Sequence, residues 1–310
     1  MTWVALGLLA GLVLGGYDFL TKLALRAQGV LTVVLVSSLL GACLWLPFLL
    51  LPAGLGLGPV LQPLGLQPLP LAWREHALLL PKSLMMVLTW VLSYYAVKAL
   101  PLSISAGVRA SGPLWTAMGA ILLLGEQLNA WQWLGLAVSM LSYFLFSLIG
   151  QKEGIRFERD GWVLCMVAAT VLSSANALYD KHIVAQLRLD LAAVQAWSAV
   201  QRGALALCLL PWVWKKGGAE SRFGLRDVPR WLRHHWPVAA IALAYVVAEF
   251  IYLTAVQVDG ALISVISVLR RTNLVMVFAL SAWLLQERFI RQKAVAIAGV
   301  LMGIVLTVVS

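Results

Sequence analysis

Four arginines lie inside long apolar stretches of this 310-residue chain, where an ionised side chain is costly. They are Arg109, Arg202, Arg270 and Arg271. A charge at the centre of a bilayer costs at least about 2.5 kcal/mol on insertion scales, so such residues usually face a cavity or a partner. A guanidinium offers a planar fork of donors that matches a carboxylate or a phosphate. The arginines therefore predict an electropositive cavity for a substrate with an anionic group.

Polar residues accompany these arginines at helical spacing, which puts each group on one face of a helix. The accompanying residues are Ser105, Gly112 and Thr116 for Arg109, Gln195 and Ser198 for Arg202, and Ser264, Ser267 and Asn273 for the pair Arg270–Arg271. A second interpretation stays open, in which the arginines pair with carbonyls, helix C-termini or acids and only hold helices together. It is weakest for the adjacent pair, because two neighbouring guanidinium groups cannot both face the same partner.

Glu249 is the one acid that the sequence places deep in an apolar stretch, since Asp18 and Asp180 are expected near span ends. Two interpretations are open. Glu249 is either a protonatable coupling site, with protons as the coupling ion, or a counter-ion fixed to Arg270 or Arg271.

Aromatic residues share helical faces with these polar positions. Tyr245 and Tyr252 flank Glu249 on one face, and Trp90 and Tyr94 lie four residues apart in an earlier stretch. An aromatic lining suits an amphipathic or aromatic metabolite. We therefore count these four aromatic residues as candidate substrate contacts.

The composition excludes a soluble protein. Hydrophobic residues make up 62% of the chain and charged residues 12%, whereas soluble proteins carry about 25% charged residues. The net charge of +10 does not indicate a nucleic-acid partner, because the basic residues lie in loops between apolar runs and on no single water-facing domain. Anionic membrane lipid is the expected partner of these loops.

Catalysis finds no support in the sequence, and we expect no cofactor or metal. The histidines lie in or next to loops without forming a ligand cluster, and the cysteines have no metal-like or disulfide-like spacing. These residues are His76, His182, His234, His235, Cys43, Cys165 and Cys208.

Ten apolar runs of about 20 residues are long enough to span a bilayer as helices. Runs of this length without period-2 alternation exclude a β-barrel, so the fold is expected to be all-α. The expected spans are residues 2–25, 30–51, 78–98, 102–124, 129–150, 161–186, 191–214, 236–257, 261–285 and 291–309.

The two halves of the chain correspond with an offset near 160. Lys22 answers to Lys181, and the spacing from Arg109 to Glu126 recurs from Arg270 to Glu287. Because each half holds five spans, the halves enter the membrane from opposite sides. We expect two inverted five-helix repeats, residues 1–150 and 161–310 with a linker at 151–160, around a central cavity near the midplane. Glu126 and Glu287 are expected as structural caps.

The loops differ in charge between the two sides. One set holds 15 Lys and Arg, while the set that includes both termini holds Arg74, Lys82, Lys181 and Arg188. By the positive-inside rule both termini lie outside, in a bacterial-type inner (plasma) membrane. Residues 52–76 are expected at the outer interface, and residues 215–235 as a basic segment with a short helix on the cytoplasmic surface.

Short motifs at span ends carry a family resemblance. Residues 16–22 (GYDFLTK) close span 1, and residues 124–128 (LGEQL) and 286–289 (QERF) close spans 4 and 9. The chain resembles the EamA-type members of the drug/metabolite transporter superfamily. That resemblance implies a cavity formed by spans 1, 3, 4, 6, 8 and 9, with spans 5 and 10 outside. Polar residues near the ends of spans 1 and 6 are Asp18, Lys22, Asn176 and Lys181.

The sequence thus favours a secondary transporter that works as an exporter of a small metabolite with a carboxylate or phosphate group, such as an amino acid. One alternative is a proton-coupled multidrug or cation exporter that binds its cargo at Glu249. The other is a lipid-head flippase or a membrane scaffold that transports nothing. Four arginines against one deep acid favour the first hypothesis.

Overall fold

The computed structural model describes residues 2–50, 65–152, 159–216, 228–280, 283 and 290–308. Every regular element in these ranges is a helix. The helices are α1 (Thr2–Ala27), α2 (Val30–Leu50), α5 (Trp73–Ala99), α6 (Leu102–Arg109), α7 (Gly112–Leu124), α8 (Ala130–Lys152), α9 (Gly161–Lys181), η1 (His182–Gln186), α10 (Leu191–Leu207), α11 (Leu210–Lys216), α12 (Val228–His234), α13 (Trp236–Gln257), α14 (Ile263–Leu269), η4 (Arg270–Thr272), α15 (Asn273–Leu280) and α16 (Ile290–Val308). The expected all-α fold is confirmed for these residues.

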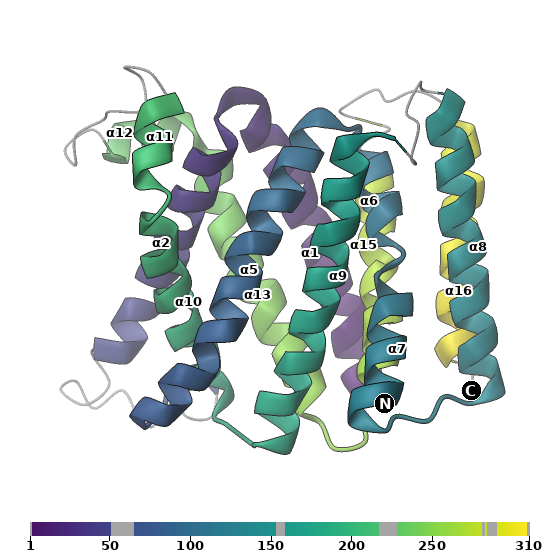
Figure 1. Ribbon diagram of the computed structural model, residues 1–310, viewed down its shortest axis with the longest axis horizontal. Coiled ribbons are helices and arrows are strands. Elements are labelled where there is room, and N and C mark those ends of the chain that lie inside the picture. The colour runs from purple at the N-terminus through teal and green to yellow at the C-terminus, as the bar shows by residue number, and fades with distance from the viewer. Residues whose placement is uncertain are drawn as a thin grey trace.

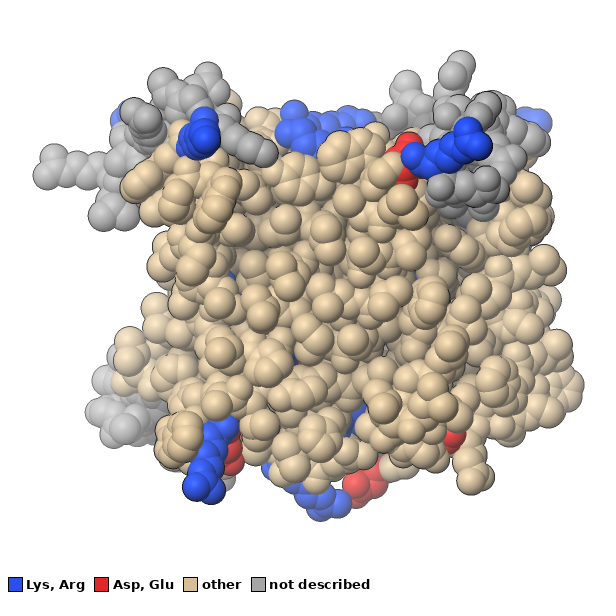
Figure 2. Space-filling view, viewed as in Figure 1, with Lys and Arg blue, Asp and Glu red and all other residues tan. Residues whose placement is uncertain are grey.

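Seven helical segments in the described part are long and apolar enough to cross a membrane. They are Thr2–Ala27, Val30–Leu50, Trp73–Ala99, Gly161–Gln186, Trp236–Gln257, Ile263–Leu280 and Arg291–Val308. Large apolar side chains such as Leu122, at 78% exposed, face outward, while Lys82 is completely buried. Figure 2 shows the charged residues gathered at two opposite ends, with a broad belt almost free of charge between them. This distribution is that of a protein surrounded by hydrocarbon.

The other three expected spans, 4, 5 and 7, coincide with helices that are not among these seven segments. Span 4 is divided into α6 and α7, span 7 is divided into α10 and α11, and span 5 is α8. The expected surface segment 215–235 ends in α12, whereas residues 217–227 lie outside the described residues. Residues 51–64, most of the linker at 153–158, and Glu287 also lie outside them.

The start of the third span was predicted wrongly. Helix α5 begins at Trp73 and not at residue 78, because the carboxylate of Glu75 accepts a hydrogen bond of 2.6 Å from the backbone N–H of Ala72. This contact caps the helix before its first apolar turn, and the backbone N–H of Glu75 donates to the carbonyl of Ala72. Lys82, which was counted with the loops although residue 82 falls within the expected span 78–98, lies inside α5.

The helices form three groups side by side (Figure 1). Helices α8 and α16 pack against one another on one flank, and α2 packs against α10 on the other. Between them, α1 packs against α13 and α5 packs against α9. Figure 1 also shows that α1 begins at the end of the bundle where both chain ends lie, whereas α9 begins at the opposite end.

Candidate functional site

A cavity of about 100 Å³ lies in the middle group of helices. Its wall comes from α1, α5, α6, α7, α9, α13, α14, η4 and α15, the helices of expected spans 1, 3, 4, 6, 8 and 9. Neither α8 nor α16 contributes to it. The lining includes the predicted residues Arg109, Arg270, Arg271, Asn273, Trp90 and Tyr245, together with Asp18.

Two interrupted helices place the arginines at this cavity. Arg109 is the last residue of α6, and the chain resumes as α7 at Gly112. Arg270 follows the end of α14, and Asn273 begins α15. Pro113 favours the first interruption, because proline has no N–H and is accommodated in the first turn of a helix. Each interruption places the first residue of the following helix, Gly112 or Asn273, on the cavity wall.

Asp18 is the carboxylate on the cavity wall, and it is 3% exposed. A guanidinium nitrogen of Arg109 lies 2.8 Å from its Oδ1. The amide of Asn273 donates a hydrogen bond of 2.9 Å to its Oδ2. The wall residues Arg109, Asn273 and Asp18 thus form one linked group in which a single positive charge is neutralised.

Arg270 and Arg271 have partners other than acids in the part of the chain that the structure describes. Arg271 donates 2.6 Å and 3.3 Å hydrogen bonds to the backbone carbonyls of Arg109 and Ser267. The guanidinium of Arg270 lies 4.2 Å from the ring centroid of Tyr252, and its buried Nε has no hydrogen-bond acceptor among the described residues. Within the described part of the chain, neither Arg270 nor Arg271 forms an ion pair.

Three of the four predicted aromatic residues, Trp90, Tyr94 and Tyr245, come together. The Trp90 ring stacks on Tyr94 at 6.3 Å and meets Tyr245 edge-on at 4.7 Å. Tyr17 completes the cluster, because its hydroxyl lies 2.8 Å from that of Tyr94 and its ring lies 5.7 Å from that of Tyr245. Sequence reasoning missed Tyr17, which appeared there only inside the motif at the end of span 1. Tyr252 lies apart from this cluster, beneath Arg270.

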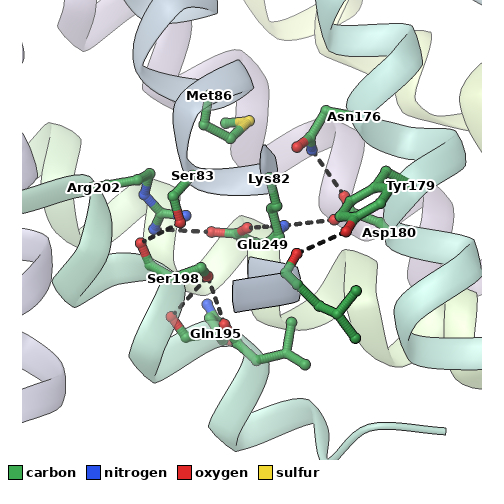
Figure 3. A network of polar contacts seen from close by, with 12 residues as sticks. Lys82, Ser83, Met86, Asn176, Tyr179, Asp180, Gln195, Ser198, Arg202 and Glu249 are labelled. Atoms are coloured by element: carbon green, nitrogen blue, oxygen red, sulfur yellow. Dashed lines mark hydrogen bonds and ion pairs between the residues drawn. The ribbon is translucent and has the colours of Figure 1, made fainter. Parts of the chain in front are cut away.

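A second charged group, which we call the ionic network, lies beside the cavity (Figure 3). The ammonium of Lys82 lies 2.6 Å from Asp180 Oδ1 and 2.9 Å from Glu249 Oε1. Arg202 lies 3.2 Å from Glu249 Oε2, and Asn176 donates a 3.0 Å hydrogen bond to Asp180. Two cations and two carboxylates, none more than 5% exposed, balance one another.

The ionic network corrects three expectations. Glu249 pairs with Lys82 and Arg202, not with Arg270 or Arg271, because α13 turns this carboxylate toward α5 and α10. Glu249 is not the only deep acid, since Asp180 is 1% and Asp18 is 3% exposed. Lys82 went unrecognised because it was counted with the adjoining loop, although it falls within the expected span 78–98. The signal that could have revealed it is a single lysine followed by apolar residues on the same helix face.

Arg202 belongs to the ionic network and does not line the main cavity. It is 2% exposed, and its guanidinium lies 5.5 Å from the ring centroid of Trp90 and 5.1 Å from that of Tyr245. It therefore forms cation–π contacts with two aromatic rings of the cavity wall, and it also neutralises Glu249.

The remaining predicted polar residues fasten helix ends. Lys22 donates hydrogen bonds of 2.6 Å to the carbonyls of Val97 and Leu100, at the C-terminus of α5. Lys181 lies 2.6 Å from Glu126, whose carboxylate accepts hydrogen bonds from the backbone N–H groups of Ile263 and Ser264 at the start of α14. Glu126 thus has the geometry of the expected structural cap. In the described residues no group of histidine, cysteine and acidic side chains could hold a metal ion.

Comparisons with known proteins bear on the fold and on the family resemblance. No curated protein matches the chain. Among solved structures 28 chains match. One, titled only "Crystal structure of protein", has a TM-score of 0.67 and 16% identity over 100% of this chain and 98% of that chain, so it supports the fold alone. Residues 1–148 match the EamA-like transporter family. The resemblance expected from the sequence is thereby confirmed: this chain is similar to EamA-like membrane transporters over residues 1–148.

Proposed function

We propose that this protein is a secondary transporter that moves a small anionic or zwitterionic metabolite, such as an amino acid, across a bacterial-type inner membrane by alternating access. In this proposal ten spans form two inverted five-helix repeats, both termini lie outside, and transport runs outward. The substrate occupies the cavity that contains Arg109, Arg270 and Arg271.

The charge of the cavity wall carries the proposal. Three guanidinium groups and one carboxylate line the cavity, and that carboxylate, Asp18, already faces Arg109. Arg270 and Arg271 are left with an aromatic ring and two carbonyls as their partners. A carboxylate or phosphate can form paired hydrogen bonds with such a fork and supply the missing negative charge.

The packing of the helices supports the repeat. Contacts of the first half recur crosswise in the second: α1 packs against α13 and α15, and α9 packs against α5 and α7. The interruption at Arg109 likewise has a counterpart at Arg270. A substrate site between inverted repeats, flanked by interrupted helices, is typical of secondary transporters.

The cation-exporter alternative is less well supported. It requires Glu249 to receive a cationic cargo, yet that carboxylate already faces Lys82 and Arg202. A cation would have to displace a buried charge before it could bind.

Binding by two lysine variants tests the anion site. Arg270→Lys and Arg271→Lys keep the charge but remove the planar fork. We expect each variant to bind its preferred carboxylate or phosphate ligand about ten- to a hundredfold more weakly, since a charged hydrogen bond is lost. Ligands come from a panel of amino acids, organic acids, nucleotides and cationic dyes, screened by transport in proteoliposomes.

Arg188→Lys is the matched control, because Arg188 is exposed and pairs with Asp259 at the surface. It should bind as the wild type does. Unchanged affinity for every anionic ligand in both cavity variants, measured at equal amounts of folded protein, would refute the anion site.

A further inference from the structure

The ionic network lies between the cavity and one end of the molecule. Lys82 is about 13 Å along α5 from Trp73, at a rise of about 1.5 Å per residue. Helix α5 begins at the end where both chain ends lie (Figure 1), and Asp180 stands next to the last residue of α9 at that same end. The ionic network thus lies toward the end of the bundle where both chain ends lie, which we call the terminal side.

A narrow space connects the two charged groups. A second cavity of about 40 Å³ has Asp180, Glu249 and Tyr252 on its wall. It shares Arg270, Ser173 and other residues with the larger cavity. Anything that loosens the ionic network would therefore widen a path from the substrate cavity toward the terminal side.

The two carboxylates of the ionic network are unequally compensated. Glu249 faces two cations, Lys82 from α5 and Arg202 from α10. Asp180 forms an ion pair with one cation, Lys82, and accepts a hydrogen bond from the amide of Asn176 on its own helix. If α5 and α9 separate, Lys82 and Arg202 can still share Glu249, whereas Asp180 loses its only ion pair. A buried carboxylate without a cation is unstable and takes up a proton.

From the elements packed against α9, the groups that face Asp180 are Lys82, Glu249, Tyr245, Tyr252 and Arg270. Arg270 is the other cation among them, but its guanidinium lies over the Tyr252 ring and forms no ion pair with Asp180. Arg202 lies beyond Glu249, Arg109 at the end of α6 pairs with Asp18, and His182 of η1 contacts Gln186. Helices α7 and α14 carry no titratable side chain.

We propose that Lys82, Asp180, Glu249 and Arg202 form a gate on the terminal side of the cavity, and that Asp180 binds the proton that opens it. The bond that must break is the 2.6 Å contact between α5 and α9, and the proton on Asp180 leaves Lys82 paired with Glu249. This inference rests on the proposed transport function and assigns proton coupling to Asp180 in place of Glu249.

Cysteine accessibility without substrate tests the gate. Cys43, Cys165 and Cys208 are first replaced by alanine, and Ser173→Cys then reports access because Ser173 lines both cavities. A membrane-impermeant maleimide is added on the terminal side of proteoliposomes, and labelling rates are corrected for thiol ionisation with an exposed cysteine. We expect corrected labelling to rise at least about fivefold from about pH 8 to about pH 5.

Two variants and one control make the result decisive. Asp180→Asn should label rapidly at every pH, since it imitates the protonated carboxylate. The double variant Lys82→Met with Asp180→Asn should do the same, and it leaves no unpaired charge that would impair folding. Asp259→Asn is the control, because Asp259 is exposed and forms only a surface pair; it should keep the wild-type pH dependence.

Labelling independent of pH in the wild type, or slow labelling of the double variant, would overturn the gate. Neither result would bear on the anion site, because the assay contains no substrate. Conversely, loss of the anion site in the binding assay leaves the pH dependence of labelling to be judged on its own.

Discussion

Glu249 and Arg202 are 5% and 2% exposed, and Arg202 would be a buried, unpaired charge without Glu249, whereas Glu249 also pairs with Lys82. Lys82 alone does not neutralise both carboxylates of the ionic network, because it contacts Asp180 as well as Glu249. At the scale of residues, these groups are therefore constrained in pairs, whereas Arg270 and Arg271 are not. The buried pairs hold structure, and the arginines without acids remain available to a ligand.

This distinction predicts the effect of neutralising Glu249. Glu249→Gln leaves Lys82 and Arg202 with one carboxylate, Asp180, and should lower the free energy of unfolding by about 3–5 kcal/mol, as when one partner of a buried pair is removed. Combining it with Arg202→Met leaves Lys82 paired with Asp180 and should restore most of the loss. Thermal unfolding in detergent measures both. A single variant as stable as the wild type would contradict the assignment of Glu249 as a counter-ion.

At the scale of elements, α1 approaches the interrupted helix of span 9 closely enough to position Arg270. Gly11 makes this approach possible, since a Cβ built there would lie 2.9 Å from the carbonyl oxygen of Arg270. Gly15 performs the same role one turn later, at 2.9 Å from the carbonyl oxygen of Asn273. The glycines of α1 thus control where the arginine segment lies.

Gly11→Ala should therefore move η4, lower the melting temperature and weaken anion binding, although alanine is the better helix former by up to about 1 kcal/mol. Gly16→Ala is a matched control on the same helix, because a Cβ at Gly16 would meet nothing within 4 Å. The control should be as stable as the wild type or slightly more so. Equal behaviour of the two variants in thermal unfolding and ligand binding would show that this close approach does not position Arg270.

At the scale of the whole molecule, the sequence predicted what depends on local patterns. Apolar length located the helices, and helical spacing brought Trp90 together with Tyr94. Partners across the bundle were not predictable, because they depend on how helices rotate against one another. Glu249 was therefore given the wrong arginines, and Lys82, near the start of its expected span, was counted with a loop because its partners lie on other helices.

The orientation of the molecule remains a prediction from charge. The loops opposite the termini carry 15 Lys and Arg. Moving Lys82 from a loop into α5 takes one basic residue from the sparser set and strengthens the difference. Because short loops rich in Lys and Arg stay in the cytoplasm, both termini are expected outside.

A reporter fused after Ser310, which lies outside the described residues, tests this orientation. We expect alkaline phosphatase, which is active only outside the cytoplasm, to give a strong signal there, and a fluorescent protein that matures only in the cytoplasm to give none. Fusions within residues 217–227, which the charge bias predicts to be cytoplasmic, should give the reverse pattern. A cytoplasmic signal from the C-terminus would show that the molecule has the opposite orientation in the membrane. The ionic gate would then open toward the cytoplasm, and protons from that side would control it.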